Sequence, residues 1–133
     1  MPGLVDLREL IRFMSPKLND GTFVFCCLPY GQIDEMKLSP VATINEPEGT
    51  TVVLDVSVAQ AAGLEFHGTF KQITLMVHSS LEAVGLTAVV AERLASEGIS
   101  ANVFAGFYHD HIFVPEDKAQ LAMTALQALR DEA

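Results

Sequence analysis

Basic residues are scarce in this chain, and the deficit excludes one class of partner. Among 133 residues there are 8 lysines and arginines against 17 aspartates and glutamates, which gives a net charge of −9 at pH 7. Affinity for nucleic acids comes mostly from neutralisation of phosphates by Lys and Arg. The sequence also lacks the basic amphipathic stripe that binds anionic lipid. We therefore expect no nucleic acid and no membrane as partners.

Long hydrophobic runs are missing as well. Half of the residues are hydrophobic and the mean hydropathy is +0.31, but no uncharged apolar run reaches the ~18 residues that a membrane-spanning helix needs. The beginning, MPGLVDLRELIRF, has acidic residues early and no basic region before an apolar stretch, unlike a secretion signal. We therefore expect a cytoplasmic protein. Its surplus apolar surface favours a core or a subunit interface, so we also expect a homo-oligomer.

Cysteine is limited to Cys26 and Cys27. Neighbouring residues on a strand point to opposite faces, so these two are poorly placed to form a disulfide or to chelate one metal together. Burial in an apolar run also raises the pKa of a thiol and lowers its reactivity. Phosphate-binding GxxxxGK and GxGxxG motifs and the GxSxG nucleophile motif are absent. We therefore expect no enzymatic activity and no cofactor.

The second half of the chain carries the clearest pattern of secondary structure. Residues 70–77 alternate between apolar and polar side chains, as a half-buried strand does. Ser79 and Ser80 are suited to cap a helix that begins there and ends at Gly98. A strand over 99–107, a turn over 108–111, a return strand stopped by Pro115 and a last helix are expected to follow. The apolar stripe of the last helix is Ala119, Ala122, Leu126 and Leu129.

The first half repeats this order more weakly, after one extra helix. Asp6 and Glu9 have the spacing of a capping pair and predict a helix over 5–14 that Ser15-Pro16 ends. The almost continuous apolar run 22–28 is typical of a central strand. The sequence then favours a short helix within 32–39, strands over 41–44 and 50–56, and a short helix over 58–62 that Gly63 closes.

The stretch VHSSLEAVGLTAVVAERLASEGISANVFAGFYHDHIFVPED resembles the ACT domains, and in particular bacterial ACT-like proteins of uncharacterised role with two such units in tandem. The resemblance implies an α+β, ferredoxin-like (split βαβ) fold with two ACT-like units packed into one body. We expect residues 1–68, with the extra leading helix, to form one unit and 69–133 the other. The C-terminal pattern lacks only the closing strand of such a unit.

ACT domains are regulatory modules that bind amino acids or other small effectors, so the resemblance implies sensing through a ligand at a unit or subunit interface. A helix start has unpaired N–H groups and favours an anion, which makes the loop from His78 to Leu86 suitable for a carboxylate. The resemblance implies that this loop faces a strand of an adjacent unit. The ligand-binding residues carried over by position are His78, Ser79, Ser80, Val84, Gly85, Leu86, Asn102, Val103 and Phe104.

Two alternatives stay open at this point. Ser79 and Ser80 can simply cap the helix while Gly85 packs it onto a strand, which would leave a ligand-free protein–protein assembly module. The stretch 108–111 has two histidines that flank an aspartate, but a metal site needs ligands that converge on one point. We expect a solvated hairpin tip there and no metal, with a metal site or a subunit contact as the alternatives.

Overall fold

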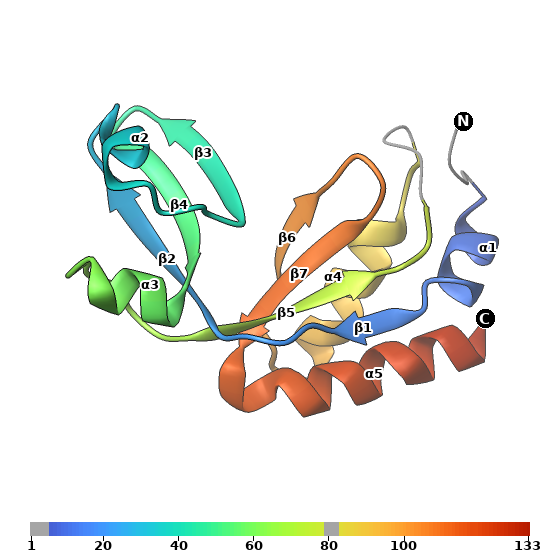
Figure 1. Cartoon of the computed structure of the whole chain (residues 1–133). Coiled ribbons are helices and arrows are strands. Elements are labelled where there is room, and N and C mark those ends of the chain that lie inside the picture. Colours follow the sequence, from blue (N-terminus) through green and yellow to red (C-terminus); the bar gives the residue numbers. More distant parts are fainter. Residues whose placement is uncertain (1–5, 79–82) are drawn as a thin grey trace. The chain divides into compact units, whose positions relative to one another are not determined.

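The computed structural model describes residues 6–78 and 83–133 of the chain. The chain divides into two compact units. Unit 1 comprises the segments Met1–Asp20 and Lys71–Ala133, and unit 2 is Gly21–Phe70. Along the sequence, unit 2 is therefore inserted into unit 1. Figure 1 shows the helices and strands of both units.

The sheet of unit 1 contains four strands, β1 (Pro16–Leu18), β5 (Phe70–Leu75), β6 (Asn102–Ala105) and β7 (Asp110–Pro115). Their order is β6-β7-β5-β1. The pairs β1 with β5 and β6 with β7 are antiparallel. The closing strand that the C-terminal pattern lacks is thus β1, which precedes the insertion and pairs through Leu18 with Ile73.

Three helices pack with this sheet, α1 (Leu7–Arg12), α4 (Leu86–Ser96) and α5 (Ala119–Glu132), and a short 3-10 helix, η1 (Glu116–Lys118), leads into α5. Figure 1 shows α5 lying along the sheet near β1 and β5. Strand alternation turns every second side chain towards the helices. The fully buried centre of this core is formed by Leu10, Met14, Ile73, Leu94, Ile112, Val114, Ala122 and Leu126.

The core explains why residues 1–20 belong to unit 1. Leu10 and Met14 have no exposed surface and lie in the cluster built from α4, α5, β5 and β7. The first helix therefore packs with the C-terminal part of the chain. The chain returns to unit 1 between residues 70 and 71.

Unit 2 has the same order of elements on a smaller scale. It contains β2 (Phe23–Leu28), α2 (Gln32–Met36), β3 (Ala42–Glu46), β4 (Gly49–Asp55) and α3 (Val56–Ala61). The strand order is β3-β4-β2, and Phe70 pairs with Phe23 beside β2. Its buried core is Val24, Cys26, Leu28, Leu38, Val52, Leu54 and Ala59.

The cysteines lie as the sequence predicts. Cys26 is buried and Cys27 is exposed, on opposite faces of β2. Burial raises the pKa of the Cys26 thiol, which leaves it protonated and unreactive at neutral pH.

Helix boundaries follow local chemistry at two places and differ from expectation at a third. The carboxylate of Asp6 accepts the Glu9 N–H at 3.0 Å, which confirms the predicted cap of α1. Asp55 caps α3 in the same way through Ser57. The helix predicted to start after Ser80 instead begins at Leu86, because Gly85 takes a left-handed conformation at φ 101°.

Both units have the α+β, ferredoxin-like fold. Within residues 6–78 and 83–133, no helix is both long and apolar enough to cross a membrane.

Candidate functional site

The junction between β5 and α4 is the first part of the candidate site. Gly85 occupies the N-cap position of α4 and has no side chain with which to cap it. Its carbonyl accepts the Val89 N–H at 3.0 Å, so the helix is regular from its first turn. The N–H groups of that first turn and the helix dipole together favour an anion at this end. Val84, directly before Gly85, is 82% exposed, whereas Leu86 is buried in the core.

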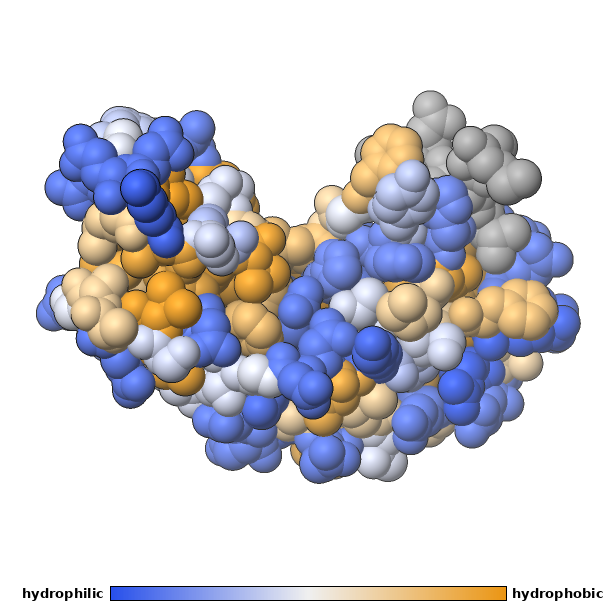
Figure 2. Space-filling model, in the orientation of Figure 1, coloured by the Kyte–Doolittle hydropathy of each residue, from blue (hydrophilic) through white to orange (hydrophobic). Residues whose placement is uncertain are grey.

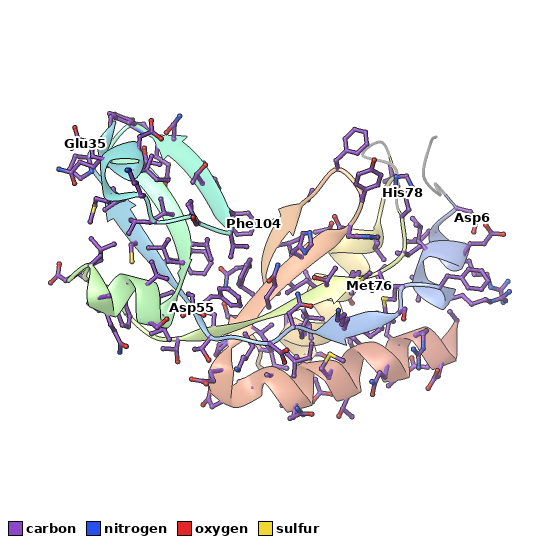
Figure 3. The ribbon with its side chains drawn as sticks, in the orientation of Figure 1. Asp6, Glu35, Asp55, Met76, His78 and Phe104 are labelled. Atoms are coloured by element: carbon purple, nitrogen blue, oxygen red, sulfur yellow. The ribbon has the colours of Figure 1, made fainter. Side chains whose placement is uncertain are left out.

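Helix α1 packs directly against this junction. A Cβ at Gly85 would lie 3.1 Å from Cδ2 of Leu7, so only glycine fits without displacement of Leu7. Figure 3 shows Asp6, Met76 and His78 at the same end of unit 1. The beginning of α1 therefore forms one side of the candidate site.

The tip of the β6–β7 hairpin, residues 106–109, forms a second side. Nδ1 of His109 donates to the Val77 carbonyl at 3.1 Å, which ties the tip to the end of β5. The His78 and Tyr108 rings lie with their centroids 5.2 Å apart. Phe107 is 71% exposed, and Figure 2 shows hydrophobic surface where this hairpin ends. The tip is thus not only solvated, because two of its side chains pack against the junction.

The residues predicted on β6 are engaged within their own hairpin. The Asn102 amide donates to the Phe113 carbonyl at 3.1 Å, and Val103 packs against the core of unit 1. The ring of Phe104 meets that of Phe113 edge to face at 5.5 Å. In unit 1 these three residues therefore hold the hairpin together, and their contact with the loop of an adjacent unit stays a prediction. Ser79 and Ser80 lie outside the described residues.

His111 lies on β7, at the far side of the hairpin tip. Its Nδ1 is 2.9 Å from Oγ1 of Thr74 and 3.3 Å from Nε2 of Gln72. Thr74 is 5% exposed and its oxygen also accepts from the side-chain amide of Asn19 at 2.8 Å. Burial, and then the nearby His109, lower the pKa of His111, although Asp110 acts against them. Burial also raises the pKa of Asp110.

Sequence reasoning treated the stretch 108–111 as one turn and so missed the separate positions of its histidines. His109 belongs to the tip, whereas His111 is the second residue of a strand. Residues 110–114 read Asp-His-Ile-Phe-Val and do not alternate, so their pattern carries no signal for a strand that begins before Ile112. Across the described part of the chain, no group of three or more His, Cys, Asp or Glu side chains can hold a metal ion.

A separate hollow of ≈ 230 Å³ lies on the helical layer of unit 1. It is lined by Val89, Glu92, Arg93, Ser96 and Leu129. Beside it, Arg93 on α4 makes two hydrogen bonds to Glu132 on α5, at 3.0 and 2.5 Å. None of the residues predicted from the sequence to bind a ligand lines this hollow.

Two family models, each described as an ACT domain, match residues 2–71 and 69–128. The chain belongs to the ACT domain family. Each model covers about one half of the chain, and the two matches overlap at residues 69–71. The compact units of this ACT protein differ from those halves in the placement of residues 1–20.

Solved structures give the same assignment. A Vibrio cholerae protein of unknown function, described as a possible transport protein, is 53% identical, with 93% of this chain and 95% of that chain covered and a TM-score of 0.85. The ligand-free regulatory subunit of aspartate kinase from Thermus thermophilus is 11% identical, with 89% and 97% covered and a TM-score of 0.70. A comparison with curated proteins finds no match.

A larger enzyme also contains this fold. E. coli aspartokinase III, solved in complex with aspartate and ADP, is 13% identical with a TM-score of 0.66, and the match covers 89% of this chain and 33% of the enzyme. At these identities the aspartate kinase structures show a shared fold. The ACT family assigns this chain to the general class of regulatory modules that bind small molecules.

Proposed function

We propose that this ACT protein is a regulatory module that binds a small molecule with a carboxylate, an amino acid being the first to test, at the junction of β5 and α4. The observation that carries the proposal is the start of α4, where a glycine replaces a capping side chain. N–H groups left without a cap attract a carboxylate, and the helix dipole adds to the attraction.

The surroundings of the junction fit the rest of an amino acid. Leu7 and the exposed Val84 offer apolar surface next to Gly85. The ring of Tyr108, beside His78, can receive an ammonium group on its face. Such a site combines one anion-binding end with a mostly apolar wall, which suits a small amphipathic ligand.

We further propose that the site is completed in a homo-oligomer, where Asn102, Val103 and Phe104 of an adjacent unit face residues 78–86. The aspartate complex of aspartokinase III supports aspartate as an early candidate for the ligand. Sedimentation velocity with and without ligand tests the assembly, because a ligand shared between subunits must increase the oligomeric fraction. We place this regulatory role in the cytoplasm, as the sequence predicts.

Thermal unfolding in the presence of each of the twenty amino acids tests the binding. A ligand that binds the native state at many times its Kd raises the melting temperature by mass action. We expect at least one amino acid to do so in a concentration-dependent way. If none of the twenty, nor common carboxylate metabolites, moves the transition, the ligand part of the proposal is wrong.

Variants at Val84 locate the site. Val84→Asp places a negative charge beside the start of α4 and is expected to abolish binding of an anionic ligand, whereas Val84→Asn has the same shape without the charge and is expected to retain it. Both changes are on an exposed side chain and should leave the fold intact. Tyr30→Asp, at the matching position before Gly31 in unit 2, should not affect binding. Equal loss with Asp and Asn at position 84 would contradict a carboxylate at this helix start.

The second candidate function is a ligand-free assembly module with the same fold. The exposed Phe107 and Val84 at one end of unit 1 favour it, because apolar side chains gathered at one place mark contact surfaces. The two functions differ in one measurement. An assembly module forms the same oligomer whatever small molecule is added, and Phe107→Ser reduces that oligomer without any change in ligand response.

A further inference from the structure

A chain of hydrogen bonds crosses the sheet of unit 1 from Asn19 to His111, which lies beside the tip of the β6–β7 hairpin. At one end, Asn19 lies where the chain leaves unit 1 for unit 2, and its N–H donates to the Gln72 carbonyl at 2.9 Å, where the chain has just returned. At the other end lies the hairpin tip, next to the proposed ligand site. Between them stand Thr74 and His111.

The side-chain amides of Asn19 and Gln72 are the donors in this chain. The Asn19 amide donates to Oγ1 of Thr74, so the Thr74 hydroxyl has its own proton free to donate to Nδ1 of His111. The Gln72 amide points its N–H at the same ring nitrogen. The Gln72 amide therefore requires Nδ1 of His111 to be an acceptor, and the Thr74 hydroxyl can donate to it as well; such a ring is neutral, with its proton on Nε2.

The opposite side of the ring meets the hairpin tip. A Cβ at Gly106 would lie 3.2 Å from Nε2 of His111 and 2.7 Å from the His109 carbonyl, so backbone and ring are in close contact there. Gly106 also donates its N–H to that His109 carbonyl at 2.9 Å. The tip and the His111 ring are therefore in direct contact at Gly106.

We propose that His111 couples the hairpin tip to the crossing point of the chain at Asn19 and Gln72, with Thr74 as the intermediate. Any effect of a bound ligand on the hairpin tip rests on the proposed function, whereas the coupling between the tip and Asn19 does not. His111 is a positioning residue in this scheme, because it contacts the tip and not the ligand. Protonation of its ring turns Nδ1 into a donor that faces the Gln72 amide, and the hydrogen bond with Thr74 then reverses, with the Thr74 hydroxyl as the acceptor.

The charged groups on the strands around His111 bear on this effect. Lys17 on β1 is the register partner of Thr74, and Lys71 lies near the start of β5. His109 in the hairpin tip and Asp110 at the start of β7 directly precede His111, and Asp110 alone among these four favours the charged ring. The neighbouring strand β6 (Asn102–Ala105) has no titratable side chain.

The test perturbs one end and observes the other, in the full chain without ligand. Tyr108→Ala changes the tip, and NMR follows the backbone and side-chain amides of Asn19. We expect these amides to shift in the wild type and in Thr74→Ser, which keeps the hydroxyl. The shift should fall to the control level in Thr74→Val, which has the same shape without the hydroxyl. The control is Tyr30→Ala, because Tyr30 is 58% exposed and Tyr108 60%.

Two results overturn the proposal. One is an Asn19 response to Tyr108→Ala that is undiminished in Thr74→Val, and the other is no response in the wild type. If Thr74→Val does not fold, the experiment is run in the opposite direction, with Asn19→Ala as the change and the NMR resonances of Tyr108 and His109 as the measurement. Unchanged resonances at these two residues then reject the coupling. Because no ligand is used, failure here leaves the proposed function standing, and failure of the amino-acid screen leaves the coupling standing.

Discussion

The two units share an order of elements but differ at the first junction between strand and helix. In unit 2 residues 29–31 connect β2 to a helix of 5 residues, and in unit 1 residues 76–85 connect β5 to a helix of 11 residues. Both helices begin after a left-handed glycine, Gly31 at φ 87° and Gly85 at φ 101°. The same scaffold therefore carries a minimal connection in one unit and an elaborated one in the other.

The longer junction is the place where this fold can carry a binding site. In unit 2 an extra Cβ at Gly31 meets nothing within 4 Å, whereas at Gly85 it meets Leu7 of α1. The elaborated junction thus has a neighbour that the minimal one lacks among the described residues. Substitutions in the two units test this contrast, from the largest expected loss of stability to the smallest.

The largest effect is expected from Leu10→Ala. Leu10 is completely buried in the core of unit 1, and removal of such a side chain costs about 2–5 kcal/mol of unfolding free energy. Hydrogen exchange measured by segment should show lost protection in β5 and β7 and retained protection in β2 and β4. Leu54→Ala, buried in unit 2, is the matched control with the reverse pattern. Loss in β2 and β4 after Leu10→Ala would place the first helix with unit 2 instead.

Substitution of Gly31 or Gly85 by alanine is expected to give the next largest loss of stability. A left-handed conformation costs an ordinary residue roughly 1–2 kcal/mol, which is the loss expected for Gly31→Ala in urea unfolding. Gly85→Ala should cost more than Gly31→Ala, because its Cβ also presses on Leu7. A double-mutant cycle with Leu7→Ala isolates that contact. Equal losses for the two glycines, with no coupling to Leu7, would remove the contrast between the junctions.

A pH effect on stability is expected in unit 1. The folded state lowers the pKa of His111 below its ordinary value of 6.5, so unfolding takes up a proton. This contribution is complete above pH 6.5 and is lost as the pH falls towards the lowered value of the folded state. Asp110 acts in the opposite sense and nearer to pH 4, since burial raises its pKa and its contribution is lost as the pH rises.

Urea unfolding at a series of pH values measures this slope. His111→Asn has no titrating ring and should flatten the slope directly below pH 6.5. A slope that survives His111→Asn would assign the pH dependence to another group.

The smallest effect is expected at the surface pair between α4 and α5. Each partner shifts the pKa of the other, raising that of Arg93 and lowering that of Glu132, through their hydrogen bonds. Glu132→Gln should reduce stability slightly at low salt and not at high salt, because exposed ion pairs are screened. Asp131→Asn is the control, since Asp131 makes a single contact of 3.3 Å with its neighbour Arg130. A loss independent of salt would indicate packing instead.

Local patterns were sufficient to predict most elements of both units, because alternation and helical spacing are properties of short segments. The alternating 70–77 and the apolar 22–28 contain the observed strands β5 and β2, and the Asp6 cap starts α1. The family resemblance then supplied the fold. These predictions rest on residues that are neighbours in sequence.

The remaining features depend on partners far along the chain. Pro16–Leu18 has no strand pattern of its own and becomes β1 through its pairing with β5. Leu7 packs against Gly85 at the start of α4, and the polar chain from Asn19 to His111 depends on three strands brought together. In each case the deciding contact is tertiary, so a single-sequence pattern could not reveal it.

The insertion of unit 2 also determines the order in which the two units can fold during translation. Translation makes α1 and β1 first, yet their partners β5, α4 and α5 emerge only after residues 21–70 have been completed. Contacts across a long loop form slowly, whereas those of the inserted unit are local. During translation, unit 2 can therefore fold first. Leu10 and Met14 of unit 1 stay exposed until α4 and α5 have been synthesised.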